Sequence, residues 1–182
     1  MLVLASQSPR RAEILRNAGI PFTVRSAAVD ETVLYAERPE DYVRRLAEMK
    51  ALAIDPAPGE IILGADTTVV IDGQMLGKPA GAADARRMLA RLSDRRHEVL
   101  TGIALRRGRD VVLDWAVTAV WFLPLSARDI DDYVASGEPM DKAGAYAIQG
   151  LASKFIQKVE GCYFNVVGLP IALVWQYLKA FG

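Results

Sequence analysis

Two arginines stand where the first turn of a helix usually carries acidic residues. In "LASQSPRRAEIL", residues 4–15, an apolar run ends, and Ser8 and Pro9 have the residue types of a helix N-cap and first helical position. Arg10 and Arg11 follow at once, although the helix dipole favours negative charge there. Free backbone N–H groups beside two guanidinium groups suit phosphate oxygens. An anionic ligand would explain the arrangement, whereas the alternative is a capped helix whose arginines point into water.

A second candidate for chemistry is Asp66, which interrupts the apolar run of "LGADTTVV". A buried carboxylate is costly in free energy unless it has a partner or a purpose. An acid at a strand end can bind a metal ion or orient a water molecule. A turn aspartate that makes local hydrogen bonds with Thr67 and Thr68 would give the same pattern. The residues alone support the two interpretations equally.

Further charged residues stand where predicted helices or strands meet loops. They are Lys50, Lys78 in "LGKP" and Lys142 in "MDKAGAY". Each lysine taken singly is better explained as a solvated surface residue. The neighbours Asp30 and Glu31 are either metal ligands or part of a polar loop.

The loop "DKAGAYAIQG", residues 141–150, is the most unusual segment of the chain. Its glycines allow a backbone to approach a ligand closely. The amide of Gln149 has one donor and one acceptor side, which matches the adjacent N3–H and O4 of uracil or thymine. The alternative is a helix-ending loop in which Gln149 caps a neighbouring carbonyl group.

The single histidine and the single cysteine have no catalytic partner nearby in the sequence. His97 flanks a predicted strand without a Ser or Cys neighbour, so a structural role is expected. Cys162 is expected to be a small core or turn residue.

The composition narrows the classes of protein. The chain has 182 residues, 52% of them hydrophobic, with 22 basic and 22 acidic residues and no net charge. This balance argues against a general nucleic-acid binder. One cysteine excludes an internal disulfide. No apolar run reaches the roughly 18 residues of a membrane span, and the N-terminal run is too short for a signal peptide. We therefore expect a cytoplasmic protein without a membrane partner.

Elements of both kinds alternate along the chain. Strands are predicted within residues 1–5, 21–27, 61–79, 97–125 and 153–161, and helices within 10–19, 39–54, 81–94, 126–137 and 169–181. The helix over 39–54 is expected to place Tyr42, Leu46, Met49 and Ala53 near one face. Predicted hairpins at "DG" and "RRGRD" interrupt the strand–helix alternation. An α/β or α+β fold with a mixed sheet follows.

Taken together, the motifs resemble one family. "SQSPRR", "LGADTTVVIDGQMLGKP", "HEVLTG", "DKAGAYAIQG" and "FIQKVEGCYFNVVGLP" occur in the order of that family's blocks and cover essentially the whole chain. The family is Maf, a group of nucleoside triphosphate pyrophosphatases. The joint match is specific, although no single block is.

The resemblance implies a fold and a reaction. The fold would be a single Maf-like catalytic domain over residues 1–182, similar to inosine triphosphatase-like proteins. It would be an elongated α/β molecule with a mixed, curved sheet, flanking helices and a cleft between two lobes, often a homodimer. The substrate would be a nucleoside triphosphate, cut between the α- and β-phosphates with a divalent cation, Mg²⁺ or Mn²⁺.

The resemblance also implies roles for residues. Asp66 matches the proton acceptor, and Glu31 matches an acidic position given a metal role. Substrate choice is linked to Arg10, Thr67 and Gln149. The polar and basic positions around the triphosphate are Ser8, Arg11, Lys50, Lys78 and Lys142.

Within the family, residues 141–150 resemble the branch that acts on dTTP and UTP. Two alternatives stay open at this point. One is a nucleotide-binding regulator of cell division with little turnover. The other is a pyrophosphatase that prefers 7-methyl-GTP.

Overall fold

The structure is a computed structural model that describes residues 1–181. In chain order the elements are β1 (Leu2–Leu4), α1 (Pro9–Asn17), β2 (Phe22–Val24), α2 (Pro39–Leu52), β3 (Ile61–Ile71), β4 (Gln74–Leu76), α3 (Ala82–Leu92), β5 (Arg96–Arg107), β6 (Asp110–Phe122), α4 (Ala127–Ala135), β7 (Ile156–Glu160), α5 (Tyr163–Val167) and α6 (Ile171–Phe181). Three 3₁₀ turns precede β7: η1 (Glu138–Asp141), η2 (Ala143–Ala145) and η3 (Leu151–Phe155).

The strands form a mixed sheet with the order β2-β1-β3-β5-β6-β7, and β4 pairs with β3. Strand β1 runs parallel to both β2 and β3, whereas β4 is antiparallel to β3 and β7 is antiparallel to β6. Parallel neighbours require crossover connections, which α1 and α2 supply here. The predicted α/β class with a mixed sheet and flanking helices is confirmed.

The chain divides into two compact units. The first contains Met1–Thr67, Thr101–Ala116 and Phe164–Gly182, and the second contains Thr68–Leu100 and Val117–Tyr163. Strands β3, β5 and β6 contribute residues to both. The single catalytic domain, the elongated shape and the cleft that the resemblance implies stay predictions.

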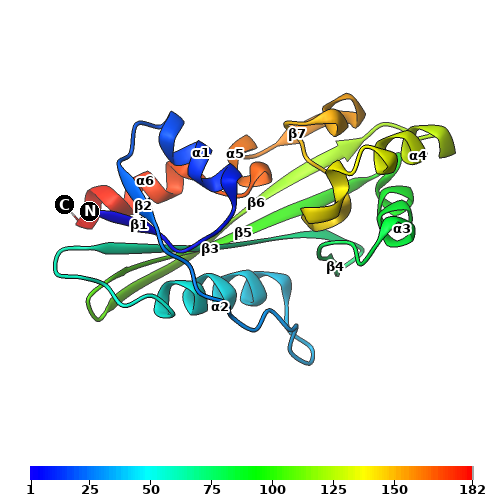
Figure 1. Ribbon diagram of the computed structural model, residues 1–182. Helices are drawn as coiled ribbons and strands as arrows, with labels where there is room; N and C mark the ends of the chain where they lie inside the picture. The colour runs from blue at the N-terminus through cyan, green and yellow to red at the C-terminus, as the bar shows by residue number, and fades with distance from the viewer. Residues whose placement is uncertain (182) are drawn as a thin grey trace. The chain divides into compact units, whose positions relative to one another are not determined.

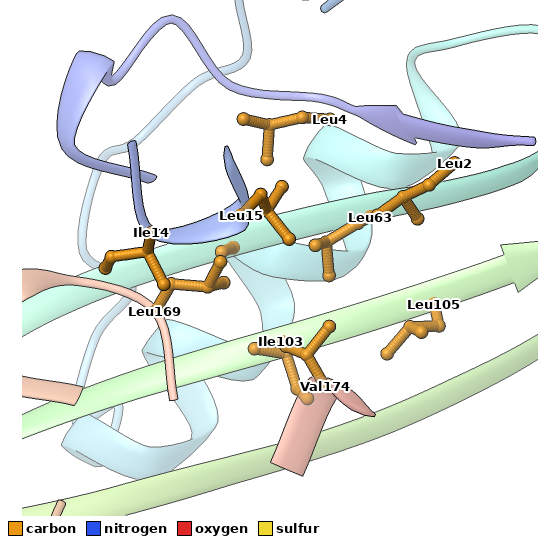
Figure 2. Close-up of a cluster of buried hydrophobic side chains, with 10 residues drawn as sticks. Leu2, Leu4, Ile14, Leu15, Leu63, Ile103, Leu105, Leu169 and Val174 are labelled. Carbon is orange, nitrogen blue, oxygen red and sulfur yellow. The ribbon is translucent and has the colours of Figure 1, made fainter. Parts of the chain in front are cut away.

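The first unit has a helical layer on each face of its strands. Helices α1 and α6 lie along one face and α2 along the other (Figure 1). Because side chains alternate along a strand, β1 turns Leu2 and Leu4 toward α1 and α6, and Val3 toward α2. Figure 2 shows the first face, where the leucines meet other buried apolar side chains: Ile14, Leu15, Leu63, Ile103, Leu105, Leu169 and Val174.

Helix α2 packs unusually close to the sheet, at two strand glycines. A Cβ atom on Gly64 would lie 2.0 Å from the carbonyl oxygen of Ala47, and one on Gly102 would lie 2.3 Å from that of Val43. The helix backbone therefore occupies the space that side chains would fill. Only glycine is compatible with this approach at either strand position.

Of the residues predicted near one face of α2, only Leu46 is fully buried. The buried residues are Val43, Leu46, Ala47 and Ala51, whereas Tyr42 and Met49 are half-buried and Ala53 is exposed. The close approach to the strands favours small residues there. Tyr42 instead donates its hydroxyl hydrogen to the carbonyl oxygen of Glu31, in the loop that precedes the helix, and Met49 accepts from Arg45 of the same helix.

The second unit contains a cluster of aromatic rings. The imidazole of His97 makes edge contacts with Phe122 and Tyr146, at centroid distances of 5.1 and 5.4 Å. Phe155 in turn contacts Phe122 and Tyr133. These rings join β5 and β6 to α4 and to the segment between α4 and β7.

Most of the predicted helices and strands are present, but one short helix was not predicted. The predicted cap of α4 is confirmed: Asp129 N–H donates to Ser126 Oγ at 3.2 Å, and the Asp129 carboxylate accepts from Ser126 N–H at 2.9 Å. The short helix α5 was missed, because "GCYFNVVG" has too few residues to show a helical period.

Candidate active site

Strand β3 directs two consecutive candidate residues to opposite faces of the first unit's sheet. Asp66 lies on the same face of the sheet as Ile62, which packs in the cluster with α2. Thr67 lies on the same face as Leu63 and Ala65, which pack in the cluster with α1 and α6. The period of two along a strand therefore separates the two side chains.

On the α2 face, one ammonium group joins two carboxylates. Lys50 Nζ lies 2.6 Å from Asp66 Oδ1 and 2.6 Å from Glu31 Oε1. The Lys50 and Asp66 side chains are only 13% and 10% exposed, whereas that of Glu31 is 49% exposed. Three residues singled out in the sequence are thus brought together, from a loop, a helix and a strand.

Burial sets the protonation chemistry of Asp66. It raises the pKa of the carboxyl group, and the negative charge of Glu31 acts in the same direction. Lys50 and Arg11 oppose this increase through their positive charges. A carboxylate with a raised pKa binds a proton more readily once ionised, which is the property required of a general base.

On the opposite face, the guanidinium group of Arg11 is buried and already has three acceptors. Its Nε donates to Gly168 O at 2.8 Å, Nη1 to Ser6 Oγ at 2.9 Å, and Nη2 to Thr67 Oγ1 at 3.0 Å. Burial lowers the pKa of Arg11. Thr67 also lies 2.9 Å from Thr101, oxygen to oxygen. Arg11 therefore holds Thr67 and residue 168 in place.

The start of α1 has groups that are suited to binding an anion. Ser8 occupies the N-cap position, but within residues 1–181 its side chain makes no capping hydrogen bond. Its N–H instead donates to Ser6 Oγ at 3.2 Å. Arg10 is half-buried, and its charge contributes to the lowered pKa of Arg11. The backbone amides of the first turn and Arg10 are thus suited to a phosphate group.

A divalent cation fits this site only if a ligand supplies most of the donors. Among residues 1–181 there is no group of three or more His, Cys, Asp or Glu side chains that could hold a metal ion. Glu31 and Asp66 nevertheless converge on one cationic nitrogen. Mg²⁺ is commonly bound by one or two carboxylates together with substrate phosphates, so this pair fits such an ion.

The other predicted site residues belong to the second unit. Lys142 Nζ donates to Glu138 O at 2.7 Å and to Asp141 Oδ1 at 2.6 Å. Lys78 is exposed. Gly144 N–H donates to Gly77 O at 3.1 Å, so the segments that carry Lys78 and Lys142 lie side by side.

Gln149 is exposed at the end of a well-anchored segment. The five residues before it are buried. Ala147 N–H donates to Tyr133 Oη at 3.2 Å, and Leu151 N–H donates to Glu138 Oε2 at 3.0 Å. Tyr133 Oη also donates to Glu138 Oε1 at 2.8 Å. These bonds fix the backbone on both sides of Gln149 and leave its amide accessible.

His97 and Cys162 have surroundings that agree with structural roles. His97 is 1% exposed, its Nε2 lies 2.8 Å from Tyr146 Oη, and burial lowers its pKa to about 4. Cys162 is half-buried between β7 and α5, where its backbone N–H and carbonyl both pair with the Thr118 hydroxyl.

Sequence reasoning did not single out several residues of this site. Ser6 and Thr101 hold Arg11 and Thr67, and Gly168 supplies a carbonyl oxygen. Ser6 had a signal, since it is the first residue of the quoted "SQSPRR". Thr101 and Gly168 likewise lie in the quoted "HEVLTG" and "FIQKVEGCYFNVVGLP". Their contacts could not be read from these motifs, because the residues they contact are distant in the sequence.

A comparison with known protein families decides the membership of the chain. The Maf family, described as "Maf-like protein", matches residues 1–181. The chain belongs to the Maf family.

Two relatives in this family carry the same name. The dTTP/UTP pyrophosphatase of Symbiobacterium thermophilum is 54% identical over 182 residues, covering 100% of this chain and 94% of the relative. That of Anaeromyxobacter dehalogenans strain 2CP-C is 54% identical over 185 residues, with the same coverage of 100% and 94%.

A solved structure supports the fold. The Ham1 protein of Staphylococcus aureus matches with a TM-score of 0.54 and 13% identity, covering 100% of this chain and 99% of that chain. At this identity the likeness concerns the fold alone.

Within residues 1–181, no helix is long and apolar enough to cross a membrane.

Proposed function

We propose that this Maf protein hydrolyses dTTP and UTP to the nucleoside monophosphate and pyrophosphate. The observation that carries the proposal is the ion-pair group in which Lys50 joins the buried Asp66 to Glu31. Family membership and the names of the two relatives support the choice of reaction and substrate. The proposed catalytic domain is the whole of residues 1–182, acting in the cytoplasm and forming a homodimer.

Asp66 is the proposed general base. Its carboxylate would accept a proton from a water molecule while the water oxygen bonds to the α-phosphorus. The bond from the α-phosphorus to the bridging oxygen would break, and pyrophosphate would leave with that electron pair. Burial, which raises the pKa of Asp66, makes it a better proton acceptor.

Glu31 is the proposed ligand for Mg²⁺ or Mn²⁺. A divalent cation bound there would supply positive charge to the phosphate oxygens. The support is geometric, since Glu31 and Asp66 already share one cation, the Lys50 ammonium. Lys50 would contribute a second positive charge near the base.

Other residues would bind and orient the substrate. Ser8, Arg10 and the amides at the start of α1 are proposed to receive phosphate oxygens. Arg11, whose guanidinium group is already used, would act by holding Thr67. For Lys78, Lys142 and Gln149 the proposed contacts with substrate rest on the family resemblance, with Gln149 pairing to the pyrimidine edge.

The test is pyrophosphate release from a panel of triphosphates with Mg²⁺ or Mn²⁺. The panel contains dTTP, UTP, CTP, GTP, ATP and 7-methyl-GTP. We expect metal-dependent release from dTTP and UTP. Asp66→Asn should lower kcat by about 10²–10⁴-fold, because the base is lost. Asp72→Asn, which alters an exposed aspartate paired with Arg95, is the matched control and should retain activity.

Each outcome has a defined meaning. Near-normal turnover by Asp66→Asn would exclude Asp66 as the base. Release from 7-methyl-GTP alone would retain the reaction and contradict the role of Gln149. Tight nucleotide binding without release from any substrate would favour the regulator.

A further inference from the structure

The segment that carries Glu31 is exposed, yet it is tied to α2. It joins β2 to α2 and contains neither helix nor strand over residues 30–38. Val33, Leu34 and Tyr35 are 49%, 55% and 102% exposed. Burial of apolar side chains therefore does little to order this loop, and its conformation must depend on polar contacts.

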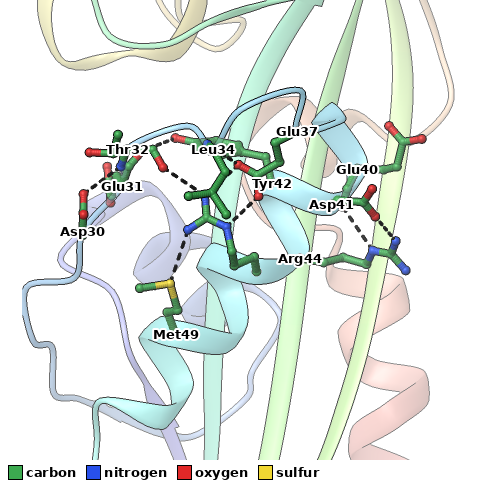
Figure 3. Close-up of polar contacts among 11 residues, drawn as sticks. Asp30, Glu31, Thr32, Leu34, Glu37, Glu40, Asp41, Tyr42, Arg44 and Met49 are labelled. Carbon is green, nitrogen blue, oxygen red and sulfur yellow. Dashed lines mark hydrogen bonds and ion pairs between the residues drawn. The ribbon is translucent and has the colours of Figure 1, made fainter.

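One guanidinium group makes several of those contacts. Arg45 Nε lies 2.6 Å from Glu37 Oε1, and Arg45 Nη2 lies 2.8 Å from Glu37 Oε2. Arg45 Nη2 also donates to Thr32 O at 3.1 Å, and Nη1 to Met49 Sδ at 3.5 Å. Figure 3 shows Thr32, Glu37 and Met49 directed at this group. One α2 side chain thus contacts the loop at both ends.

Further hydrogen bonds hold the loop residues on the other side of the Arg45 contact. Glu37 Oε2 also accepts the N–H of Leu34 at 3.0 Å, and Asp30 Oδ1 accepts the N–H of Thr32 at 2.9 Å. Tyr42 Oη of α2 donates to the carbonyl oxygen of Glu31 at 3.1 Å (Figure 3). The backbone is therefore fixed at Glu31 itself and on its C-terminal side.

This pair differs from an ordinary surface ion pair. Exposed pairs contribute little because both side chains lose entropy and water screens their charges. Here the Glu37 side chain is only 7% exposed and the Arg45 side chain 24%. The bidentate geometry also fixes orientation as well as distance.

We propose that Arg45 and Glu37 are positioning residues that hold the loop so that Glu31 reaches Lys50 and Asp66. The inference rests on the proposed function, in which Glu31 binds the divalent cation. Neither residue touches the reacting atoms. Their effect passes through the backbone of Thr32 and Leu34 to the neighbouring Glu31.

The variants are Arg45→Met, Glu37→Gln and the double variant, with Arg44→Gln as the matched control. Arg44 is the preceding residue of α2 and also forms a 2.6 Å ion pair, with Asp41 of the same helix. Arg44→Gln therefore removes a more exposed ion pair of the same helix, at 37% and 47% side-chain exposure, without releasing the loop. Arg45→Lys keeps the charge but offers one nitrogen, so it should show a partial effect. It also serves if Arg45→Met does not fold.

The first readout is amide hydrogen exchange over residues 31–37, which needs no activity. We expect faster exchange in Arg45→Met and Glu37→Gln, and wild-type exchange in Arg44→Gln. The double variant should be less affected than the sum of the two single variants, because both single changes remove the same ion pair. The separate contacts of Arg45 with Thr32 and of Glu37 with Leu34 add only the remainder. Unchanged exchange, or additive effects, would overturn the proposal.

The second readout is the Mn²⁺ concentration that gives half-maximal pyrophosphate release from dTTP. Loss of groups that orient a metal ligand typically weakens metal binding 10–100-fold, so we expect an increase of about tenfold in Arg45→Met. The kcat at saturating Mn²⁺ should change much less. An unchanged Mn²⁺ requirement would overturn the functional part of the inference. An inactive wild-type protein would instead contradict the proposed function, while hydrogen exchange would still decide whether the pair orders the loop.

Discussion

The two units bury polar groups in opposite ways. In the first unit, charged groups converge: Lys50 lies between Asp66 and Glu31. In the second unit, the buried polar groups are neutral: His97 and Tyr146 share a 2.8 Å contact among aromatic rings. Neutral pairs stabilise a core at small electrostatic cost, whereas buried charges must be offset by partners.

This difference separates a site from a scaffold. A buried charge group that could be replaced by apolar residues with little loss of stability is better explained by function than by folding. The aromatic cluster of the second unit needs no such explanation. Substitutions in the group of Asp66, Lys50 and Glu31 should therefore mainly affect activity, whereas substitutions in the aromatic cluster should mainly affect stability.

The largest expected change in stability is at the aromatic cluster. Phe122 is 1% exposed and contacts the rings of His97, Tyr146 and Phe155. Phe122→Ala should lower the free energy of unfolding by about 3–5 kcal/mol, because it removes these contacts and leaves a cavity. Urea denaturation measures this change. A loss below 1 kcal/mol would contradict the picture of a tightly packed cluster.

The next effect is at Arg11 in the first unit. Arg11→Lys keeps the positive charge, but a single nitrogen cannot reach Ser6, Thr67 and Gly168 together. We expect a loss of about 2–3 kcal/mol in unfolding free energy. Arg16→Lys, an exposed change on the same helix, is the control. Wild-type stability in Arg11→Lys would show that positive charge, and not the hydrogen-bonding geometry, is what this position requires.

The dependence of stability on pH provides a third comparison. Burial lowers the pKa of His97 from 6.5 to about 4. The unfolded chain therefore binds a proton between these values while the folded protein does not. The contribution to stability is complete above pH 6.5 and is lost as the pH falls through 4, with about 2 kcal/mol gone at pH 5.

His97→Gln tests this dependence because His97 is the only histidine in the chain. The variant should be less stable than wild type at pH 7.5, but its unfolding free energy should change little between pH 7 and pH 5. Chemical denaturation at several pH values measures the slope. An unchanged slope would assign the titration to another group.

The smallest expected effect is a gain in stability, whereas the changes above lower it. Burial raises the pKa of Asp66, so the ionised carboxylate destabilises the folded state relative to the protonated one. The favourable contribution of Asp66 to stability is present at low pH, where its carboxyl group is protonated. It is lost as the pH rises through the pKa that Asp66 has in the folded protein. Asp66→Asn should therefore raise the unfolding free energy at pH 8 while lowering kcat by about 10²–10⁴-fold. A large loss of stability would show that Asp66 mainly serves folding.

The sequence was informative where local pattern and local chemistry agree. The apolar run of β1, the Ser-Pro start of α1 and the capping box at Ser126 follow from residue types over short distances. The sequence did not identify the buried face of α2, because the spacing of Tyr42 and Met49 is as helical as that of Val43 and Ala47. Only the close approach at Gly64 and Gly102 selects the second set.

For the site, the sequence identified the residue types but not their partners. Asp66 was recognised from a carboxylate inside an apolar run, and Lys50 only as one of several lysines. Their 2.6 Å contact depends on α2 packing against β3. Arg45 and Glu37 had no signal, because a charged pair eight positions apart resembles any solvated surface.

By itself, the sequence determined the alternation of strands and helices, the mixed character of the sheet and the family of the chain. These depend on the period of apolar residues and on motifs of adjacent residues, which the chain carries before it folds. The tertiary structure decided which charges meet. It placed Asp66 beside Lys50 and Thr67 beside Arg11, because a strand turns consecutive side chains to opposite faces and each face here is covered by a different helix.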